Sequence, residues 1–202
     1  SRRGAKAKRI AVENVLGVFE QNGYEYVSPP LIEFEDSLLA GKGRLMGKQT
    51  FRMLDPVSQK LMAVRPDITL QVARIAQSRL SSEPLPLRLC YSGDVLWVKG
   101  SHLRGERQHT QGGIELIGAP SPLADAEVIA IGITALEGIG IKDISVDLNA
   151  PHLTRLILKQ ESQPVKNKSA LLAAISRKDK TYIAKSSIEN KDVLLKLMQT
   201  SG

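Results

Sequence analysis

Residues 90–118, CYSGDVLWVKGSHLRGERQHTQGGIELIG, contain the clearest fold signal of the chain. The stretch opens with an apolar run that includes Val95 and continues into a basic, polar loop from Lys99 to Arg107. A second run, from Gln108 to Ile117, follows the loop. Two strand-like runs joined by a polar segment predict an antiparallel hairpin with a long loop.

The second run of this hairpin predicts a small polar site. Side chains alternate between the faces of a strand, so Gln111, Gly113 and Glu115 share one face and Ile114 lies on the other. Glu115 can hold an ammonium group, Gln111 offers both a donor and an acceptor, and Gly113 leaves room for a ligand against the backbone. We therefore predict one core face and one pocket for a small zwitterion. The same spacing also allows an ordinary antiparallel sheet with one solvated face.

The hairpin resembles the second signature motif of class II aminoacyl-tRNA synthetases. The histidyl branch of that family has the pattern aromatic-Arg-x-Glu, a basic loop, and then Arg-x-Phe-His-Gln-x-Gly-x-Glu. Arg107, Gln111, Gly113 and Glu115 match the second half of the pattern in register.

The first half of the pattern departs from the family. Trp97 stands where the family has the arginine that binds the α-phosphate of ATP, and Lys99 replaces the glutamate. Gly105 falls where a loop arginine assists activation. An arginine fork matches phosphate oxygens in a bidentate way, whereas an indole carries no charge and a single donor. The resemblance therefore implies that the amino-acid half of the site is kept, that the ATP half is damaged, and that no catalytic residue remains.

A second matching run, RPDIT at residues 65–69, precedes the hairpin. By itself it predicts a strand-to-helix junction at which Asp67 or Thr69 caps the helix. It also resembles the Arg-Pro-Glu-x-Thr stretch of histidyl-tRNA synthetases, in which the acidic residue and the threonine contact the α-amino group of histidine. The resemblance implies a histidine-binding set of Asp67, Thr69, Gln111 and Glu115. Asp in place of Glu keeps the charge but shortens the reach by one methylene, so the affinity can differ.

The beginning of the chain predicts an amphipathic helix from about Ala5 to Gln21 and then a short strand that ends at the paired prolines 29–30. Together they resemble the first class II motif, a helix and a strand ending in proline that form the dimer interface. Pro30 falls on the proline of that motif, which implies a homodimer.

The remaining segments give simpler predictions. Residues 41–48, GKGRLMGK, lack the Gly-Lys-Ser/Thr ending of a phosphate loop and are predicted to be a flexible loop. Residues 50–64 predict a strand, a turn and a strand, and residues 119–141 predict a turn and a helix. The alternating apolar residues of the segment 144–148 predict another strand, and a further helix follows it.

The composition of the chain changes after residue 160. The segment 161–202 is polar and rich in lysine, with apolar residues at helical spacing, and predicts a helical appendage or the start of an insertion segment. We therefore divide the chain into a core, residues 1–160, and this appendage. The third class II signature motif is not found in the sequence, so we expect the chain to be truncated.

The composition is that of an ordinary globular protein, with 42% hydrophobic and 24% charged residues among 202. The net charge of +7 permits nucleic-acid binding without demonstrating it. The single cysteine, Cys90, excludes an internal disulfide and fits a reducing compartment. Neither a secretory signal nor a run of ~20 apolar residues is found, so we predict a cytoplasmic protein without membrane attachment. No grouping at metal-ligand spacing predicts a metal, and no cofactor is predicted.

A synthetase-like core without ATP-activating residues resembles one particular family, the regulatory subunits of ATP phosphoribosyltransferase, which are histidyl-tRNA synthetase paralogues in histidine biosynthesis. The resemblance covers residues 5–160 and includes TFRMLDPVSQ at 50–59 and VRPDITLQVARIA at 64–76. It implies an α+β fold, a class II synthetase-like core with a mostly antiparallel sheet flanked by helices.

The same resemblance implies a function without catalysis. Such a subunit binds L-histidine as an effector, assembles with the short-form catalytic subunit, activates it and conveys feedback inhibition. Two alternatives stay open, namely a histidyl-tRNA synthetase fragment that activates ATP, and a paralogue that binds tRNA through its positive charge. Binding of the second kind would fall steeply with salt.

Overall fold

The computed structural model describes residues 2–100, 105–148, 151–162 and 167–200. Part of the basic loop predicted between Lys99 and Arg107 therefore lies outside the described residues. The chain forms two compact units, residues 1–143 and residues 144–202. Each unit has a hydrophobic core of its own.

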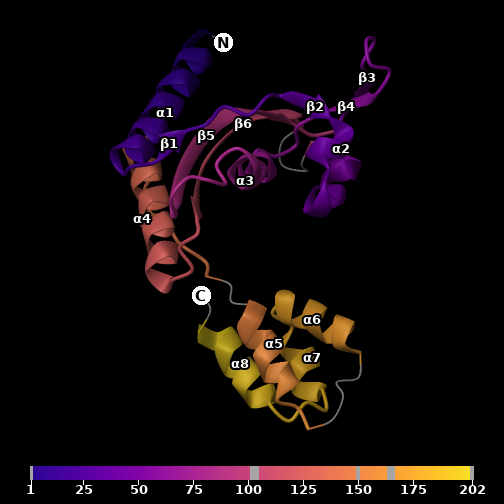
Figure 1. Cartoon of the computed structure of the whole chain (residues 1–202). Helices are drawn as coiled ribbons and strands as arrows, with labels where there is room; N and C mark the ends of the chain where they lie inside the picture. Colours follow the sequence, from indigo (N-terminus) through magenta and orange to yellow (C-terminus); the bar gives the residue numbers. More distant parts are fainter. Residues whose placement is uncertain (1, 101–104, 149–150, 163–166, 201–202) are drawn as a thin grey trace. The chain divides into compact units, whose positions relative to one another are not determined.

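A three-stranded sheet lies at the centre of the first unit (Figure 1). Strand β5 (Leu87–Leu96) pairs along its whole length with the antiparallel strand β6 (Gln108–Ile117). The short strand β1 (Glu25–Tyr26) pairs in parallel with the other edge of β5. The register places Tyr91 directly opposite Gly113. The predicted hairpin is thus confirmed.

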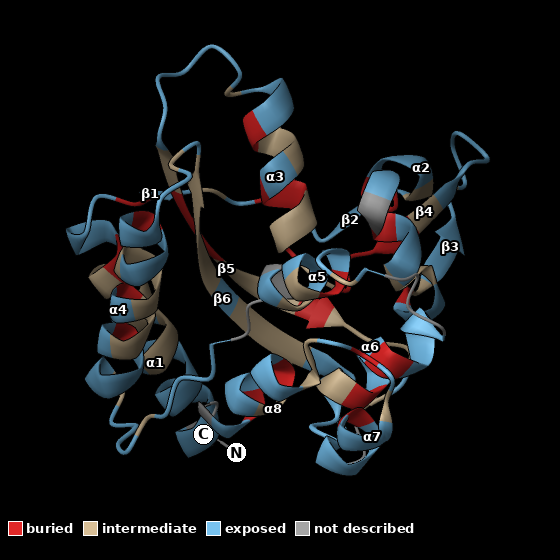
Figure 2. Cartoon of the chain, turned by 90° about the horizontal axis from the view of Figure 1, so that it is seen from below, coloured by how far each residue is buried: buried red, intermediate tan, exposed pale blue. Residues whose placement is uncertain are grey.

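Helices cover both faces of this sheet. Helices α1 (Arg2–Gln21) and α4 (Pro122–Gly138) pack on one face, and α3 (Thr69–Ser78) packs on the other (Figure 1). Buried residues follow β5 and the sides of the helices that face it, as Figure 2 shows. The core under α1 and α4 contains Phe19, Tyr24, Cys90, Ile131 and Ala135. The core under α3 contains Ile68, Val72, Ala76, Leu89, Tyr91 and Val95.

The second of these cores corrects one prediction. The face that carries Gln111, Gly113 and Glu115 was expected to be a polar site without a core. In the structure α3 packs on that face, and Val72 of α3 and Tyr91 of β5 are buried between the helix and the sheet. The polar site is therefore a half-buried margin of a packed layer, which lowers the local dielectric around its carboxylates.

A second, smaller sheet is built from β2 (Ile32–Phe34), β4 (Leu61–Val64) and β3 (Arg52–Leu54), in that order and antiparallel. The predicted strand, turn and strand over residues 50–64 are confirmed. The Asp55 carboxylate accepts hydrogen bonds from two backbone N–H groups of the turn between β3 and β4.

Residues 41–48 are not a flexible loop, and that prediction is wrong. After helix α2 (Glu35–Leu38) the chain forms a 3-10 helix, Gly41–Gln49. Its Met46 packs against a small core with Leu38 and Ala63, and the carbonyl of Met46 accepts the Thr50 hydroxyl at 2.9 Å. This burial orders a segment whose glycines and lysines alone predict flexibility.

The second unit is helical. Its elements are α5 (Pro151–Lys159), α6 (Lys168–Ser176), α7 (Lys180–Lys185) and α8 (Lys191–Thr200). Their common core contains Leu158, Leu171, Ile183, Ile188, Leu194 and Met198. The unit begins at residue 144 and not at 161, because Leu158 of α5 is buried among the helices that follow it.

The strand predicted over residues 144–148 is wrong, because this segment pairs with no strand among the residues that the structure describes. Val146 and Leu148 are 46% and 75% exposed, so their alternation does not place them against a sheet. None of the helices in the described residues is long and apolar enough to cross a membrane.

Candidate functional site

The junction between β4 and α3 supplies the first part of the site. The Asp67 carboxylate accepts the backbone N–H of Thr69 at 2.7 Å through Oδ1. This contact closes a turn directly before α3, whose N-cap residue is Ile68 and has no side-chain cap hydrogen bond, so neither Asp67 nor Thr69 is the predicted cap. The second oxygen of Asp67, Oδ2, accepts a hydrogen bond from Nε2 of Gln111 at 3.1 Å. The aspartate thus contacts both the first residue of α3 and strand β6.

Gln111 joins the strand to the helix junction. Its side-chain carbonyl accepts the backbone N–H of Ile68 at 3.0 Å, while its amide nitrogen donates to Asp67. Both polar atoms of the glutamine are therefore engaged. The orientation of the amide is fixed by this pair of contacts, because a flipped amide would set donor against donor.

Tyr91 connects the remaining predicted residues, although it is not among the residues predicted from the sequence. Its hydroxyl donates to Oε1 of Glu115 at 3.1 Å and lies 3.0 Å from Oγ1 of Thr69. Burial raises the pKa of Tyr91 to about 12, so the phenol remains a donor. The alternation within one strand gave no signal for it, because only the pairing of β5 with β6 sets Tyr91 opposite the glycine between Gln111 and Glu115.

The space over Gly113 is taken by that phenol. A Cβ at Gly113 would lie 2.6 Å from the Tyr91 hydroxyl oxygen and 2.7 Å from Cζ. The prediction that Gly113 leaves room for a ligand against the backbone is therefore wrong. Glycine is needed here so that the Tyr91 ring can cross the strand toward Glu115.

Two carboxylates give the site its electrostatic character. Burial raises the pKa of Glu115, and the negative charge of Asp67 raises it further, while hydrogen bonds from Tyr91 and Thr69 act in the opposite direction. A half-buried pair of carboxylates favours a cation between them, since the cation offsets both desolvation and repulsion. The arrangement is suited to an ammonium group with several hydrogen-bond partners.

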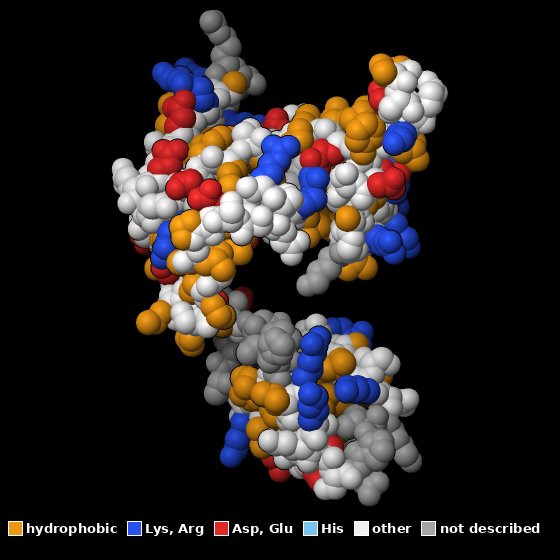
Figure 3. Space-filling view, in the orientation of Figure 1, with side chains coloured by type: hydrophobic (Ala, Val, Ile, Leu, Met, Phe, Trp, Pro, Cys, Tyr) orange, Lys and Arg blue, Asp and Glu red, His pale blue; other side chains and the backbone are white. Residues whose placement is uncertain are grey.

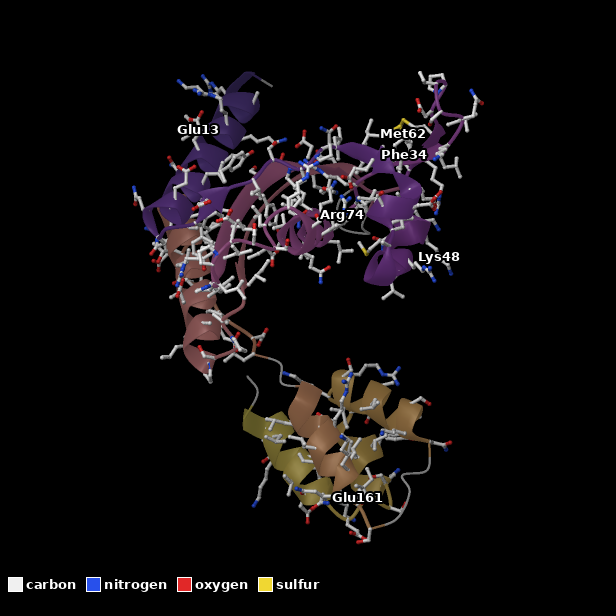
Figure 4. All side chains as sticks on the ribbon, in the orientation of Figure 1. Glu13, Phe34, Lys48, Met62, Arg74 and Glu161 are labelled. Carbon is white, nitrogen blue, oxygen red and sulfur yellow. The ribbon has the colours of Figure 1, made fainter. Side chains whose placement is uncertain are left out.

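The other end of the hairpin has a different chemistry. The indole Nε1 of Trp97 donates to the carbonyl of Pro66 at 2.8 Å, and the indole ring lies 4.9 Å from the ring of His109, measured between centroids. A cleft of about 430 Å³ next to Trp97 is lined by Lys48, Gln49, Trp97, Lys99 and Gly100. Figure 4 shows Lys48 at the margin of the 3-10 helix.

The structure thus brings together Asp67, Thr69, Gln111 and Glu115, joined by Tyr91. The other residues singled out from the sequence are not part of this hydrogen-bonded set. Gly105 is exposed and Lys99 lines the cleft. The side chain of Pro30 is exposed, while its carbonyl accepts Nε2 of Gln71 at 2.9 Å. Across the residues that the structure describes, no three metal-ligating side chains form a group.

A strand hairpin with helices on both faces, carrying this carboxylate site, defines a class II aminoacyl-tRNA synthetase-like core. The histidyl-tRNA synthetase family model matches residues 2–202. The chain belongs to the histidyl-tRNA synthetase family.

Several curated relatives of the chain are named ATP phosphoribosyltransferase regulatory subunits. The chain is 44% identical to the one from Rhodospirillum centenum over 198 residues, which cover 98% of the chain and 51% of the relative. It is 55% identical to the one from Rhodospirillum rubrum over 142 residues, which cover 70% of the chain and 37% of the relative. The chain therefore spans about half the length, or less, of these relatives.

Solved structures show the same fold. An ATP phosphoribosyltransferase regulatory subunit/histidyl-tRNA synthetase from Bacillus halodurans is similar with a TM-score of 0.77 at 23% identity, over 96% of this chain and 51% of that one. A histidine–tRNA ligase subunit from Alicyclobacillus acidocaldarius is similar with a TM-score of 0.66 at 26% identity, over 88% of this chain and 51% of that one. The predicted α+β, class II synthetase-like fold is confirmed.

Proposed function

We propose that the chain is part of a non-catalytic regulatory subunit of ATP phosphoribosyltransferase that binds L-histidine. The observation that carries the proposal is the pairing of an intact carboxylate site at Asp67 and Glu115 with Trp97 at the position of the family's ATP-binding arginine. The names of the curated relatives support the same function.

The histidine ammonium is proposed to lie between Asp67 and Glu115. The two carboxylates supply negative charge, and Thr69 with Tyr91 supplies hydroxyl groups beside them. Gln111 holds the junction of α3 against the strand and so keeps Asp67 in place. The pocket binds and orients the amino acid, and none of these residues needs to transfer a proton for that purpose.

The chain is proposed to form no bond itself. Adenylate formation needs cationic groups on the phosphates of ATP, and the family pattern supplies them from this hairpin. Here the corresponding positions are Trp97 and Gly105, and the motif glutamate is Lys99. An indole that already donates to the Pro66 carbonyl has no further donor to offer a phosphate.

Regulation requires that histidine distinguish two states of the assembly with the short-form catalytic subunit. A ligand shifts an equilibrium only by its difference in affinity for the two states. A coupling of about 1–3 kcal/mol is typical of allosteric proteins and would suffice for feedback inhibition. The proposed partners are therefore L-histidine and the short-form catalytic subunit, in the cytoplasm, with no cofactor bound by this chain.

A homodimer is also proposed, with Pro30 at its interface. The strand after Pro30 leads into the smaller sheet, whose register aligns Phe34, Met62 and Met53 in one row. Phe34 and Met53 are 43% and 41% exposed. Figure 4 shows Phe34 beside Met62, and Figure 3 shows hydrophobic side chains gathered over this part of the first unit. Exposed apolar rows of this kind mark interaction surfaces.

Calorimetric titration of the purified chain with L-histidine is the direct test. We expect saturable binding of one histidine per chain, with L-alanine as a control ligand that keeps the ammonium and carboxylate but lacks the imidazole. Absence of histidine binding would contradict the proposed pocket. A second assay adds the chain to a short-form phosphoribosyltransferase, where activation that histidine reverses is expected, and unchanged activity would contradict the regulatory role.

A further inference from the structure

We propose that Trp97 is a positioning residue of the amino-acid pocket. Its indole N–H holds the carbonyl that precedes Asp67, so that the pocket is ordered with no nucleotide bound. This inference rests on the proposed histidine site and goes beyond it, because it gives a role to the residue at which the family pattern is broken.

The first support is the direct contact. Nε1 of Trp97 donates to the Pro66 carbonyl at 2.8 Å, and Pro66 itself is buried. A buried carbonyl without a partner is unfavourable by about 1–3 kcal/mol, and proline leaves this segment with fewer N–H groups for other pairing. The indole is therefore the partner that satisfies the residue directly before Asp67.

The second support is that the hairpin makes successive hydrogen bonds to the segment 65–69. The backbone N–H of Leu96 donates to the Arg65 carbonyl at 3.2 Å, and the Gln111 side chain accepts the N–H of Ile68 at 3.0 Å. The contact from Trp97 to Pro66 lies between these two. Three successive contacts thus fix the turn that carries Asp67. They come from Leu96 at the end of β5, from Trp97 directly after it, and from Gln111 of β6.

The third support is the packing of the indole itself. The ring lies 4.9 Å from the His109 ring at an angle of 53°, which is a tilted aromatic contact. The backbone N–H of Trp97 donates to the Arg107 carbonyl at 2.8 Å, so the far side of the hairpin loop holds both the ring and the backbone of the residue. An indole that packs on a neighbouring ring, on a backbone that is itself hydrogen-bonded, can direct its single donor with little loss of entropy.

The consequence for ligand binding follows from where Asp67 points. One of its oxygens accepts the backbone N–H of Thr69 and the other accepts from Gln111, so a shift of the turn moves the carboxylate and the N-terminus of α3 together. A turn that is already ordered binds an ammonium without a further loss of entropy on ordering, which is the general benefit of preorganisation. Trp97 acts through Asp67 and does not need to touch the amino acid.

The test compares Trp97→Phe with Tyr24→Phe in the purified chain. Trp97→Phe keeps an aromatic ring and removes the donor to Pro66. Tyr24→Phe is the matched control, since it removes one hydrogen bond of 3.2 Å, to Glu127, under α4 on the other face of the sheet. The measurements are the dissociation constant for L-histidine by calorimetry and hydrogen exchange of the free chain, followed at the Ile68 and Thr69 amides.

We expect Trp97→Phe to weaken histidine binding about three- to tenfold, the value of one neutral hydrogen bond, and to speed exchange at Ile68 and Thr69. Exchange in α1 should stay unchanged, and Tyr24→Phe should change neither measurement in the pocket. Normal binding, or weaker binding without faster exchange at these two amides, would overturn the role of Trp97. If the unsubstituted chain fails to bind histidine, the proposed function itself fails, and this is seen before any variant is compared.

Discussion

The two ends of the central hairpin differ in what they offer a ligand. Toward Glu115, the hairpin and the start of α3 together present two carboxylates, an amide and two hydroxyls, which are half-buried. Toward Trp97, the corresponding positions hold two aromatic rings in contact and a hydrogen bond that is satisfied within the chain. One supersecondary motif can therefore keep the recognition of an amino acid while the neighbouring recognition of phosphate is replaced by internal packing.

The largest effect is expected from neutralising the carboxylate end. Glu115→Gln should weaken L-histidine binding by about 2–3 kcal/mol, or roughly 30- to 150-fold, because it removes a charged partner of the ammonium. The free chain should be no less stable near neutral pH, since burial already raises the pKa of Glu115 and makes its charge unfavourable. Calorimetry and urea unfolding measure the two quantities.

The matched control for this variant is Glu127→Gln. Glu127 pairs with Arg88 and Tyr24 away from the pocket, so its substitution should leave the histidine affinity unchanged. Equal losses of affinity in the two variants would mean that the effect is general and not a property of the carboxylate end.

The pH dependence of histidine binding should come from the Glu115 carboxylate. Because the pKa of Glu115 is raised in the folded state, its charge forms only as the pH rises above that value, and histidine affinity should fall when the pH is lowered through it. The effect of pH on stability has the opposite sign. The folded state holds the proton more tightly, so this contribution to the free energy of unfolding grows as the pH falls toward the unfolded value of about 4.3. A wild-type chain and Glu115→Gln with identical pH profiles would contradict this assignment.

The packing of Tyr91 over Gly113 gives the next test. Gly113→Ala places a Cβ 2.6 Å from the phenol oxygen, and overpacking of this kind typically lowers the free energy of unfolding by about 1–3 kcal/mol. Gly112→Ala is the control one residue away, where a Cβ has its nearest contact at 3.7 Å. Urea unfolding should give a lower free energy of unfolding for Gly113→Ala than for Gly112→Ala. Equal values would show that the ring of Tyr91 moves aside freely.

A smaller change is expected from removing the hydroxyl of Tyr91 alone. Tyr91→Phe keeps the ring over Gly113 but deletes the donor to Glu115 and the contact with Thr69. We expect histidine affinity to fall by about 1–2 kcal/mol, between the values typical of a neutral hydrogen bond and of a hydrogen bond to a charged group. Calorimetry at one pH suffices, and unchanged affinity would mean that Tyr91 only fills space.

The comparison also shows which features a sequence can predict. Strand alternation placed Gln111 and Glu115 on one face, whereas Asp67 was added to the same site only by the resemblance of the run from Arg65 to Thr69 to histidyl-tRNA synthetases. Tyr91 was not predicted because its role depends on the pairing register of two strands, which alternation within one strand does not determine. His109 was not predicted for a related reason, since its contact with Trp97 joins the two sides of a loop.

Two errors in the fold have physical causes of the same kind. The glycine-rich segment 41–48 is ordered because the partly buried Met46 packs against a core that comes from other elements. The apolar alternation at 144–148 forms no strand because no sheet edge within the described residues pairs with it. Local composition gives the propensity of a segment, whereas the partners that decide its conformation lie far away in the sequence.

The smallest effect is expected from ATP. With magnesium present, ATP should change the affinity for L-histidine by less than about twofold, because the indole of Trp97 has no charge and its single donor is bound to Pro66. Lys48 and Lys99 line the adjacent cleft, so weak, salt-sensitive binding of ATP is compatible with this expectation if it is not coupled to histidine. Calorimetry with and without ATP measures the coupling, and pyrophosphate exchange measures activation. Histidine-dependent exchange would show that the two ends of the hairpin still act as one catalytic site, and the proposed division between them would then be wrong.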